Sequence, residues 1–273
     1  MSSEPWLVFD VSALAYRAYH TLRDLSYEGI PTAITYGILR DVLLLRDRFG
    51  SNSFVFTFDR GKSKRCELSP EYKSQRKKQI EDDPEQIAIR KSIRQQIRTF
   101  HDEILPALGF ANIVSQHGYE ADDLMASLIF QYPQQKIILV GSDHDLFQLL
   151  SDNVSMWSIA KKKLLNGMTF RREWGISPSQ WADVLAIAGC STDNVKGVKG
   201  VGPKTAVKFL AGSLQKGAIF DRIVQSSSLW RDNLKLVQLP FAGTMPVEFK
   251  QDLVTGKRFN RVLKDLGIRS LRY

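Results

Sequence analysis

The sequence predicts an α/β fold with a central, largely parallel sheet flanked by helices. Three apolar runs, at residues 6–10, 54–59 and 136–143, each end in aspartate. Continuous apolar runs of this length suit strands that are buried on both faces. Between them, residues 34–49 and 85–108 carry apolar side chains at helical spacing. Strands that alternate with helices indicate βαβ units, and therefore parallel strands.

The three predicted strands place acidic residues at one edge of the sheet. Asp10, Asp59 and Asp143 end the runs, and Asp145 follows two residues after the last of them. Ligands of such sheets bind beyond the carboxyl ends of the strands. We therefore expect these carboxylates to share one rim.

The segment 119–123, Tyr-Glu-Ala-Asp-Asp, brings further acids close together. Apolar residues at helical spacing follow it up to Ile129, so Glu120, Asp122 and Asp123 should begin a helix. Acids are common at helix starts because they favour the positive end of the dipole. Alternatively, a cation joins Glu120 and Asp123, which share one side of the helix. The segment alone leaves both interpretations open.

The acids together predict a metal centre. The candidate ligands are Asp10, Asp59, Glu120, Asp122, Asp123, Asp143, Asp145 and Asp193. Hard oxygen ligands suit Mg²⁺ or Mn²⁺, and the four histidines show no zinc-motif spacing. Two such ions about 4 Å apart would activate water and stabilise the leaving oxygen of a phosphodiester.

Residues 197–206, Gly-Val-Lys-Gly-Val-Gly-Pro-Lys-Thr-Ala, predict a tight hairpin that opens a helix. Pro203 suits the first helical position, and the free N–H groups there can bind a phosphate. The candidate contacts are Gly200, Gly202, Lys204 and Thr205. Such a hairpin would bind the phosphate backbone of a nucleic acid without preference for its base sequence. A plain glycine-rich turn is the alternative, whereas a nucleotide phosphate loop lacks the required lysine spacing.

Residues 60–78 form a basic arm directly after Asp59. Its cations are Arg60, Lys62, Lys64, Arg65, Lys73, Arg76, Lys77 and Lys78, and Tyr72 lies among them. Most charge runs are solvated loops. At the mouth of an acidic site, however, such an arm could guide a single strand or supply a cation to the transition state.

The amino-acid composition indicates which kind of binding partner and which cellular compartment to expect. The 273 residues carry a net charge of +9, which favours a polyanionic partner. No apolar run is long enough to span a bilayer, so we expect no membrane partner. The two cysteines, Cys66 and Cys190, make no disulfide framework, and we therefore expect a reducing, cytoplasmic location.

In combination, these motifs resemble the 5′ nuclease, or flap endonuclease, superfamily. The nearest likeness is to the nuclease domain of bacterial DNA polymerase I and its stand-alone phage counterparts. The resemblance runs from Asp10 to about Leu210. It is carried by residues 9–17, 58–63, 70–76, 119–124, 141–149 and 193–206.

The resemblance implies roles for individual residues. Asp10, Asp59, Glu120, Asp122 and Asp123 should hold the first metal ion, and Asp143, Asp145 and Asp193 the second. Lys73 and Arg76 should act on the scissile phosphate from a helical arch, with Arg65 at its base and Tyr72 as a further nucleic-acid contact. Tyr16 should stack on a nucleotide near the cut, with Arg17 beside it. The hairpin should belong to a helix–three-turn–helix that grips duplex DNA, with K⁺ at residues 197–202.

The expected organisation follows from these roles. Residues 1–165 should form the metal-binding nuclease core, with the basic arch at 60–84, and residues 166–273 a helical lobe with the duplex-binding motif at 179–211. We expect a monomeric, divalent-metal-dependent 5′–3′ exonuclease and flap endonuclease for replication or repair, in the cytoplasm or nucleoid of a bacterial or phage-infected cell. Its substrate would be DNA with a 5′ flap, a nick or a primer, including an RNA/DNA primer.

Two other functions share parts of this pattern. A PIN-type ribonuclease or RNase H-like primer remover would also have an acidic rim, but it needs no duplex-gripping hairpin. A non-catalytic DNA-junction binder would need a disabled metal cluster, and only one expected acid is missing. Cleavage of flap, nicked, primer and single-stranded substrates would separate the three.

The missing acid is at Cys190. Members of the superfamily place aspartate after the glycine that Gly189 matches, and a thiol is a poor ligand for Mg²⁺. We expect a weakened second metal site, with flap cutting retained better than exonuclease action. The alternative is that water fills the gap.

Overall fold

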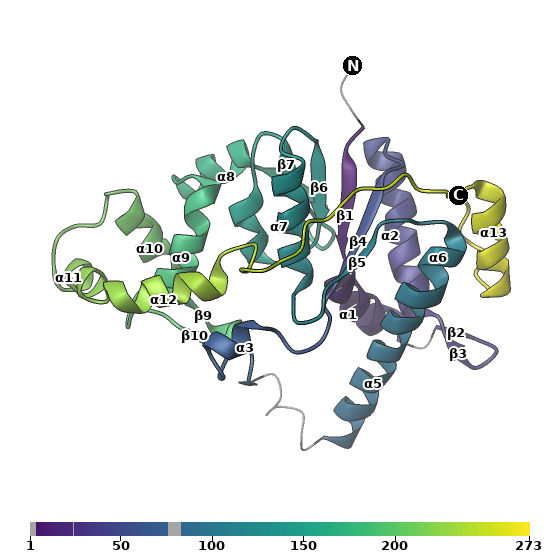
Figure 1. The fold of residues 1–273 in the computed structure, drawn as a ribbon, viewed down its shortest axis with the longest axis horizontal. Coiled ribbons are helices and arrows are strands. Elements are labelled where there is room, and N and C mark those ends of the chain that lie inside the picture. Colours follow the sequence, from purple (N-terminus) through teal and green to yellow (C-terminus); the bar gives the residue numbers. More distant parts are fainter. Residues whose placement is uncertain (1–3, 24, 76–82) are drawn as a thin grey trace.

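The predicted α/β class is confirmed. A computed structural model of the protein describes residues 4–23, 25–75 and 83–273. Its main sheet has six strands in the order β5-β4-β1-β6-β7-β8, all parallel except β8. The strands are β1 (Trp6–Asp10), β4 (Phe54–Phe58), β5 (Ile113–Ser115), β6 (Ile137–Val140), β7 (Val154–Ser158) and β8 (Lys163–Asn166). Figure 1 shows the sheet near the middle of the molecule, with helices around it.

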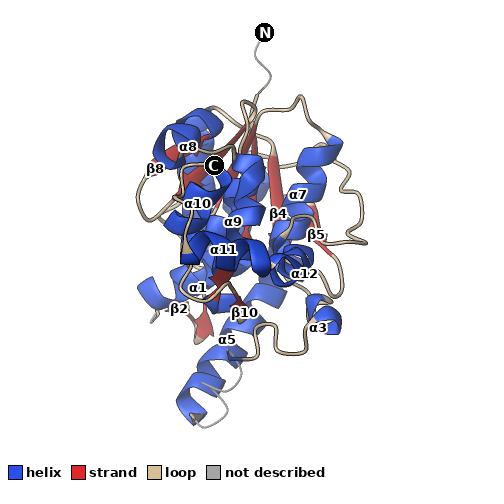
Figure 2. Ribbon diagram, turned by 90° about the vertical axis from the view of Figure 1, so that its left-hand side faces the viewer, coloured by secondary structure: helices blue, strands red, loops and turns tan. Residues whose placement is uncertain are grey.

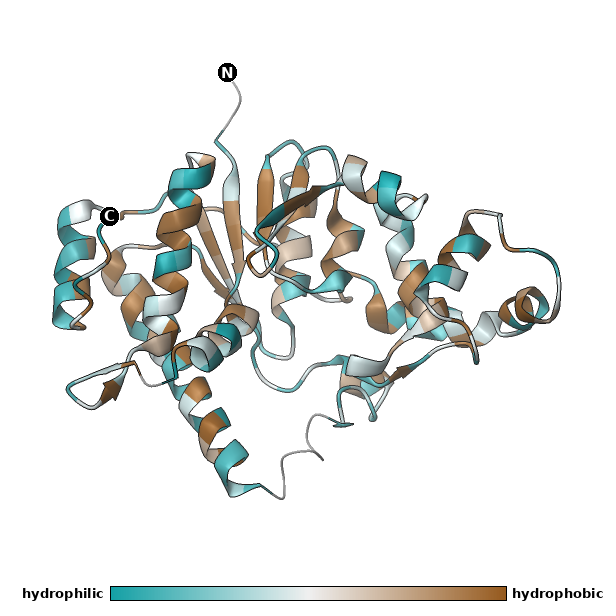
Figure 3. Cartoon of the chain, turned by 180° about the vertical axis from the view of Figure 1, so that it is seen from behind, coloured by the Kyte–Doolittle hydropathy of each residue, from teal (hydrophilic) through white to brown (hydrophobic). Residues whose placement is uncertain are grey.

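Alternation along the strands divides the core into two layers. Leu7 and Phe9 of β1 pack into one hydrophobic cluster, whereas Val8 between them packs into the other. Phe54, Phe56 and Val55 of β4 divide in the same way, because successive side chains of a strand point to opposite faces. Both faces are therefore covered, as Figures 2 and 3 show, and the three central strands β4, β1 and β6 are mostly apolar.

Different helices cover the two faces. One face packs against α1 (Val11–Thr21), α2 (Ala33–Phe49), α5 (Pro84–Thr99) and α6 (Leu105–Leu108), and the other against α7 (Ala121–Gln131), η2 (His144–Leu149) and α9 (Trp181–Ala188). The helix predicted at 85–108 is continuous from α5 through a π-helical turn, η1 (Phe100–Ile104), into α6. It begins at Pro84 because the Asp83 side chain accepts hydrogen bonds from the next amides.

The C-terminal part of the chain contains two helices on either side of the glycine-rich segment, which forms a turn between β10 and α10. After α8 (Gly167–Trp174) and η3 (Pro178–Gln180), the helices α9 and α10 (Pro203–Leu210) enclose a two-stranded hairpin, β9 (Gly189–Cys190) and β10 (Val195–Lys196). The buried Asn233 side chain donates to the carbonyls of Ala186 and Lys196 and fixes α12 to this motif.

Three further helices follow in the C-terminal part of the chain. They are α11 (Ala218–Gln225), α12 (Ser227–Val237) and α13 (Gly256–Asp265), the last of which packs against α6. Two small elements complete the description, the hairpin β2 (Ser26–Tyr27) and β3 (Ile30–Pro31) and the helix α3 (Arg65–Leu68). Within the described residues, no helix has the length and apolar character needed to cross a membrane.

Candidate active site

The carboxyl ends of the three central strands meet at one rim. Because β4, β1 and β6 are neighbours, Asp10 ends β1 beside the loops that carry Asp59 and Asp143. An Asp10 carboxylate oxygen accepts from the amide of Ala13, 3.0 Å away, and so caps α1. The structure thus brings together acids that are more than 130 positions apart in the sequence.

The acidic helix start joins the same rim. The Asp59 carboxylate accepts from the amide of Ala121 at 2.8 Å, which holds the first turn of α7 beside β4. On the other side, the Asp143 carboxylate accepts from the amide of Asp145 at 3.0 Å and begins η2. Backbone amides therefore orient two of the rim carboxylates.

Asp10, Asp59, Asp143 and Asp145 form what we call the open group. Burial raises the pKa of Asp10 to about 7, with Asp59 and Asp143 adding repulsion. Burial, then Asp143 and Asp193, raise the pKa of Asp145 to about 7. Among the described residues, no lysine or arginine forms an ion pair with any of the four. The open group is a concentration of carboxylates that have no ion-pair partner in the part of the chain that the structure describes.

Cationic side chains of the protein itself balance the charge of three other acids at the rim. We call this set the sealed group, and its members are Glu120, Asp123, Asp193, Arg65, Tyr72 and Lys73. Arg65, 2% exposed, binds both oxygens of the fully buried Asp123 at 2.7 Å. The amides of Phe241 and Glu120 also donate to Asp123. Both oxygens of Asp123 are therefore occupied and enclosed in this arrangement, and its role as a metal ligand stays a prediction. The cation that joins Glu120 to Asp123 is the Arg65 guanidinium, so the contact of Arg65 with DNA also stays a prediction.

The basic arm supplies the other half of the sealed group. Lys73 Nζ lies 2.7 Å from Glu120 and 3.8 Å from Asp193. Burial favours the neutral acid at Glu120, yet Lys73 and Arg65 outweigh it and lower the pKa of this carboxyl. The Tyr72 hydroxyl lies 3.1 Å from oxygens of both Glu120 and Asp193. Tyr72 is only 5% exposed, so the structure places it inside the sealed group, and its contact with nucleic acid stays a prediction.

Asp122 lies between the two groups. Its carboxylate accepts from the amide of Asp123 at 2.9 Å. Burial, followed by repulsion from Asp123 and Glu120, raises its pKa well above the ordinary value. Since it forms no ion pair among the described residues, Asp122 resembles the open group in its electrostatics.

The open group fits a divalent cation by its chemistry. Its donors are all carboxylate oxygens, which suit Mg²⁺ or Mn²⁺. Burial, with repulsion from neighbouring carboxylates, raises the pKa of Asp10 and of Asp145, and a cation would stabilise their charged forms. As placed, no three His, Cys, Asp or Glu side chains of the described residues converge at ligand distance. Binding an ion therefore requires these side chains to rotate toward one another. Cys190 Sγ lies 3.0 Å from Thr192 Oγ1, and burial raises the pKa of this thiol, so it offers no thiolate near neutral pH.

A loop contact missed by sequence reasoning anchors the arm. The Asn194 side chain donates to the carbonyl of Glu71 and accepts from Gln75, and the Lys73 amide donates to the carbonyl of Asp193 at 2.9 Å. These contacts hold Lys73 at the rim. Its predicted partner Arg76 lies outside the described residues.

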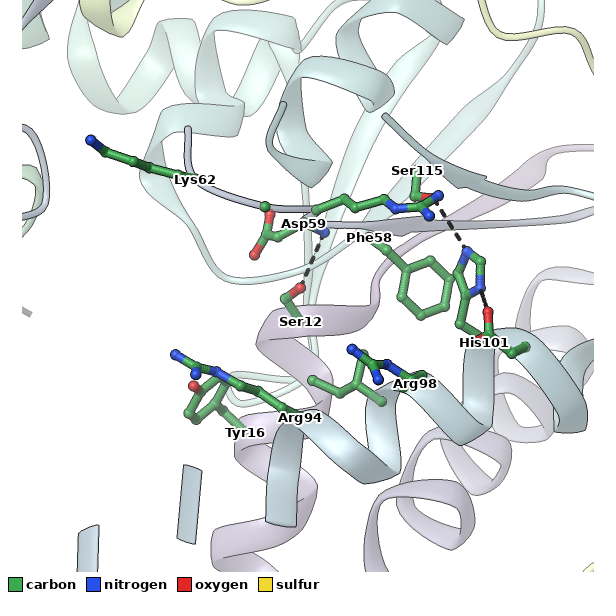
Figure 4. Close-up of a pocket in the computed structure, with 13 residues that line it drawn as sticks. Ser12, Tyr16, Phe58, Asp59, Lys62, Arg94, Arg98, His101 and Ser115 are labelled. Carbon is green, nitrogen blue, oxygen red and sulfur yellow. Dashed lines mark hydrogen bonds and ion pairs between the residues drawn. The ribbon is translucent and has the colours of Figure 1, made fainter. Parts of the chain in front are cut away.

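A cleft of about 880 Å³ opens beside the rim, between α1, α5 and the loop after β4. Tyr16, 38% exposed, lines it, and its stacking on a nucleotide stays a prediction. Arg94 and Arg98 of α5 also line it (Figure 4). The apolar stripe of this helix gives no indication of them, although a spacing of four residues is typical of side chains on one shared face. Arg17 instead lies 2.7 Å from Asp41 in an ion pair, so its DNA contact stays a prediction.

The glycine hairpin presents its backbone to the surface. Gly200, Gly202 and Lys204 are exposed, Thr205 is half-buried, and Gly200 has a φ of +77°, which favours glycine. Pro203 begins α10 as expected. The carbonyl of Lys199 accepts from Arg222 at 2.8 Å, so one hairpin carbonyl already has a cationic partner. The K⁺ site stays a prediction.

Comparisons with known proteins agree across the chain. The model for the 5′-3′ exonuclease N-terminal, resolvase-like domain matches residues 5–175, and that for the 5′-3′ exonuclease C-terminal SAM fold matches residues 176–238. A 5′-3′ exonuclease of Buchnera aphidicola is 30% identical over 237 residues, which cover 85% of this chain and 78% of the relative. The thermostable DNA polymerase I of Thermus aquaticus is 34% identical over 77% of this chain but only 24% of its own length.

Solved structures share the fold. The 5′-exonuclease of phage T5, determined with zinc bound, superposes with a TM-score of 0.75 at 21% identity, covering 96% of this chain and 98% of that one. The catalytic core of Rad2 in complex with DNA gives a TM-score of 0.59 at 14% identity, covering 97% and 88%.

Proposed function

The chain belongs to the 5′-3′ exonuclease family, and on that premise we propose that it cuts DNA at 5′ flaps, nicks and primer ends with divalent metal ions. The observation that carries the proposal is the open group, with Lys73 at its edge. Structural relatives crystallised with divalent metals and with DNA support the same conclusion. We propose a monomer that acts in replication or repair.

Asp10, Asp59, Asp143 and Asp145 would hold the ions, with Asp122 beside them. When bound, the ions supply a nucleophile from water and stabilise the leaving oxygen. Mg²⁺ or Mn²⁺ matches the all-oxygen donor set. With Cys190 in place of a carboxylate, we propose that the second ion is bound more weakly than the first.

The chain's own residues position the phosphate. Lys73 lies at the rim, 2.7 Å from Glu120, and its side chain is 25% exposed. An ammonium there can stabilise charge on the scissile phosphate. The hairpin at residues 197–205 would hold the duplex through backbone amides and Lys204, and the predicted K⁺ would bind there.

Cleavage assays with Asp10→Asn test the proposal directly. The substrates are 3′-labelled DNAs with a 5′ flap, a nick, an RNA primer or no duplex, with Mg²⁺, Mn²⁺ or EDTA. We expect flap and nick cutting by the wild type, none in EDTA, and a loss on the order of 10³-fold in the variant, because metal-ion catalysis contributes several kcal/mol. Duplex affinity in EDTA should be retained. An Asp10→Asn protein that cuts normally would refute the proposed centre.

A further inference from the structure

The glycine hairpin contains a β-turn whose two ends are fixed by the core. The amide of Val201 donates to the carbonyl of Val198 at 3.0 Å, which closes a four-residue turn. Both valines are buried, and the amide of Val198 also donates to the carbonyl of Ile187 in α9 at 2.8 Å. The peptide that joins Lys199 to Gly200 lies in the middle of the turn, and both of these residues are exposed.

The backbone angles identify the orientation of this central peptide. Gly200 has a φ of +77°, whereas the φ of Lys199 is negative. A negative φ followed by a positive φ at the two central positions is typical of a type II turn. In a type I turn the central peptide is rotated to face the other way, and the third residue has a φ of about −90°. Glycine populates positive and negative φ about equally, so Gly200 permits both types.

Arg222 of α11 holds the central peptide in the type II orientation. Its Nη1 donates to the carbonyl of Lys199 at 2.8 Å. A Cβ atom at Gly200 would lie 3.3 Å from the same nitrogen, so the guanidinium lies directly against the turn. The helix α11 is itself fixed, because Ile223 is fully buried and its carbonyl accepts from the Trp230 indole. In a type I turn the carbonyl of Lys199 would point away from Arg222, and this hydrogen bond would be lost.

The orientation of the peptide decides where the amide of Gly200 points. A peptide bond is planar and trans, so its carbonyl and its N–H point in opposite directions. With the carbonyl of Lys199 turned toward Arg222, the N–H of Gly200 points away from the guanidinium. Within the part of the chain that the structure describes, neither this amide nor that of Gly202 has a hydrogen-bond acceptor. Both glycines are exposed, so the two donors are available to the oxygens of a phosphate.

We propose that Arg222 is a positioning residue for duplex binding, which selects the peptide orientation that presents the Gly200 amide to a phosphate of the DNA backbone. The proposal rests on the proposed grip of the hairpin on duplex DNA and adds to it a residue outside the glycine-rich segment. Arg222 acts through the turn and does not itself bind the phosphate. The group that it presents is a neutral amide, whereas Lys204 would offer a charge.

The salt dependence of binding separates positioning from direct contact. Anisotropy titrations with a fluorescent duplex that has no flap, in EDTA and at several KCl concentrations, would compare Arg222→Met with the wild type. We expect about tenfold weaker binding, because a hydrogen bond between an amide and a charged oxygen is lost. The slope of log affinity against log salt concentration should stay unchanged. Loss of a cation that contacts a phosphate would instead reduce this slope by about 0.9.

The matched control is Arg269→Met, which removes the same charge from an exposed arginine near the C-terminus. Figure 1 shows the C-terminus and α11 at opposite ends of the molecule. Because charges farther away than the Debye length of about 10 Å are largely screened, this variant should bind the duplex within about twofold of the wild type.

A double variant tests whether Arg222 acts through the central peptide. Gly200→Ala disfavours the positive φ of the type II turn and therefore weakens duplex binding by itself. If both residues control one peptide, Arg222→Met/Gly200→Ala should lose no more affinity than Gly200→Ala alone. Losses that add would mean that the two residues act independently, which contradicts the proposal.

Nuclear magnetic resonance reports the peptide orientation in the protein without DNA. In a type II turn, the ψ of about +120° at Lys199 brings its Hα close to the amide proton of Gly200, and in a type I turn these protons lie farther apart. With ¹⁵N-glycine and ¹³C-lysine labels, the nuclear Overhauser effect between them should be strong in the wild type and weaker in Arg222→Met.

Three results would overturn the role of Arg222: unchanged duplex affinity of Arg222→Met, a salt slope reduced by about 0.9, or an unchanged nuclear Overhauser effect. A wild-type protein that does not bind duplex DNA would refute the proposed grip of the hairpin as well. Because no measurement requires turnover, a wild type that binds duplex but does not cut would refute the nuclease function alone.

Discussion

The two acidic groups at the rim contrast in how their charge is balanced. In the sealed group, Arg65 and Lys73 approach carboxylates to 2.7 Å, and the pKa of Glu120 is lowered. In the open group, no described cation forms an ion pair, and the pKa values of Asp10 and Asp145 rise to about 7. Similar residues on neighbouring segments thus serve different purposes. The sealed group has a structural role at the rim, whereas the carboxylates of the open group are available to a ligand.

Removing the central cation of the sealed group should have the largest effect. Arg65→Met leaves Asp123 buried without its counter-ion, which typically costs about 3–5 kcal/mol. Urea denaturation measures the loss. Arg60→Met, an exposed arginine five residues earlier, is the control and should stay within about 0.5 kcal/mol of wild type. A cost below about 1 kcal/mol for Arg65→Met would remove the distinction between the groups.

The open group predicts an unusual pH dependence of stability without metal. Folded Asp10 and Asp145 keep a proton up to about pH 7, whereas the ordinary value is 3.8. Between these values the folded state binds more protons than the unfolded state, so stability falls as pH rises. In EDTA we expect Tm to drop by a few degrees between pH 5 and pH 7.5, at about 2–4 °C per kcal/mol.

Two comparisons isolate this pH effect. Mn²⁺ should reverse the drop, because a cation replaces the protons. Asp10→Asn/Asp145→Asn should flatten it, while Asp47→Asn/Asp232→Asn, two exposed aspartates elsewhere, should leave it intact. A wild-type Tm that rises over this range in EDTA would contradict an uncompensated open group.

Sequence patterns predicted the parts of the site that depend on local periodicity. Asp10, Asp59 and Asp143 were placed at one rim because each ends an apolar run, and parallel strands align their ends. The pairing of Arg65 with Asp123, 58 positions apart, has no local signature. The same holds for β5, which has only three residues. Arg94 and Arg98 line a cleft because α5 packs against α1, and the sequence carries no local signal for that packing.

Cys190 offers a way to enlarge the open group. It lies close enough to Asp193 and Asp145 for their charges to disfavour its thiolate. Cys190→Asp adds an oxygen ligand, and we expect about tenfold tighter binding of the weaker Mn²⁺, measured by calorimetry, with exonuclease action gaining more than flap cutting. Cys190→Ser is the control of similar size. If Cys190→Asp changes neither affinity nor the ratio of activities, water already supplies the missing ligand.

The smallest effect should come from Tyr72, and it separates a structural role from a DNA contact. Tyr72→Phe removes a hydroxyl that lies 3.1 Å from both Glu120 and Asp193, at a cost of about 1 kcal/mol. Single-strand affinity should stay within about twofold, because the ring is buried. Tyr119→Phe is the matched control, since its hydroxyl donates to the carbonyl of Ala242 away from the acids. The stability cost of Tyr72→Phe should shrink when Glu120→Gln is also present, and Tyr119→Phe should show no such coupling. This result would place the Tyr72 hydroxyl energetically within the sealed group. Weakened DNA binding by Tyr72→Phe would instead support its role as a nucleic-acid contact.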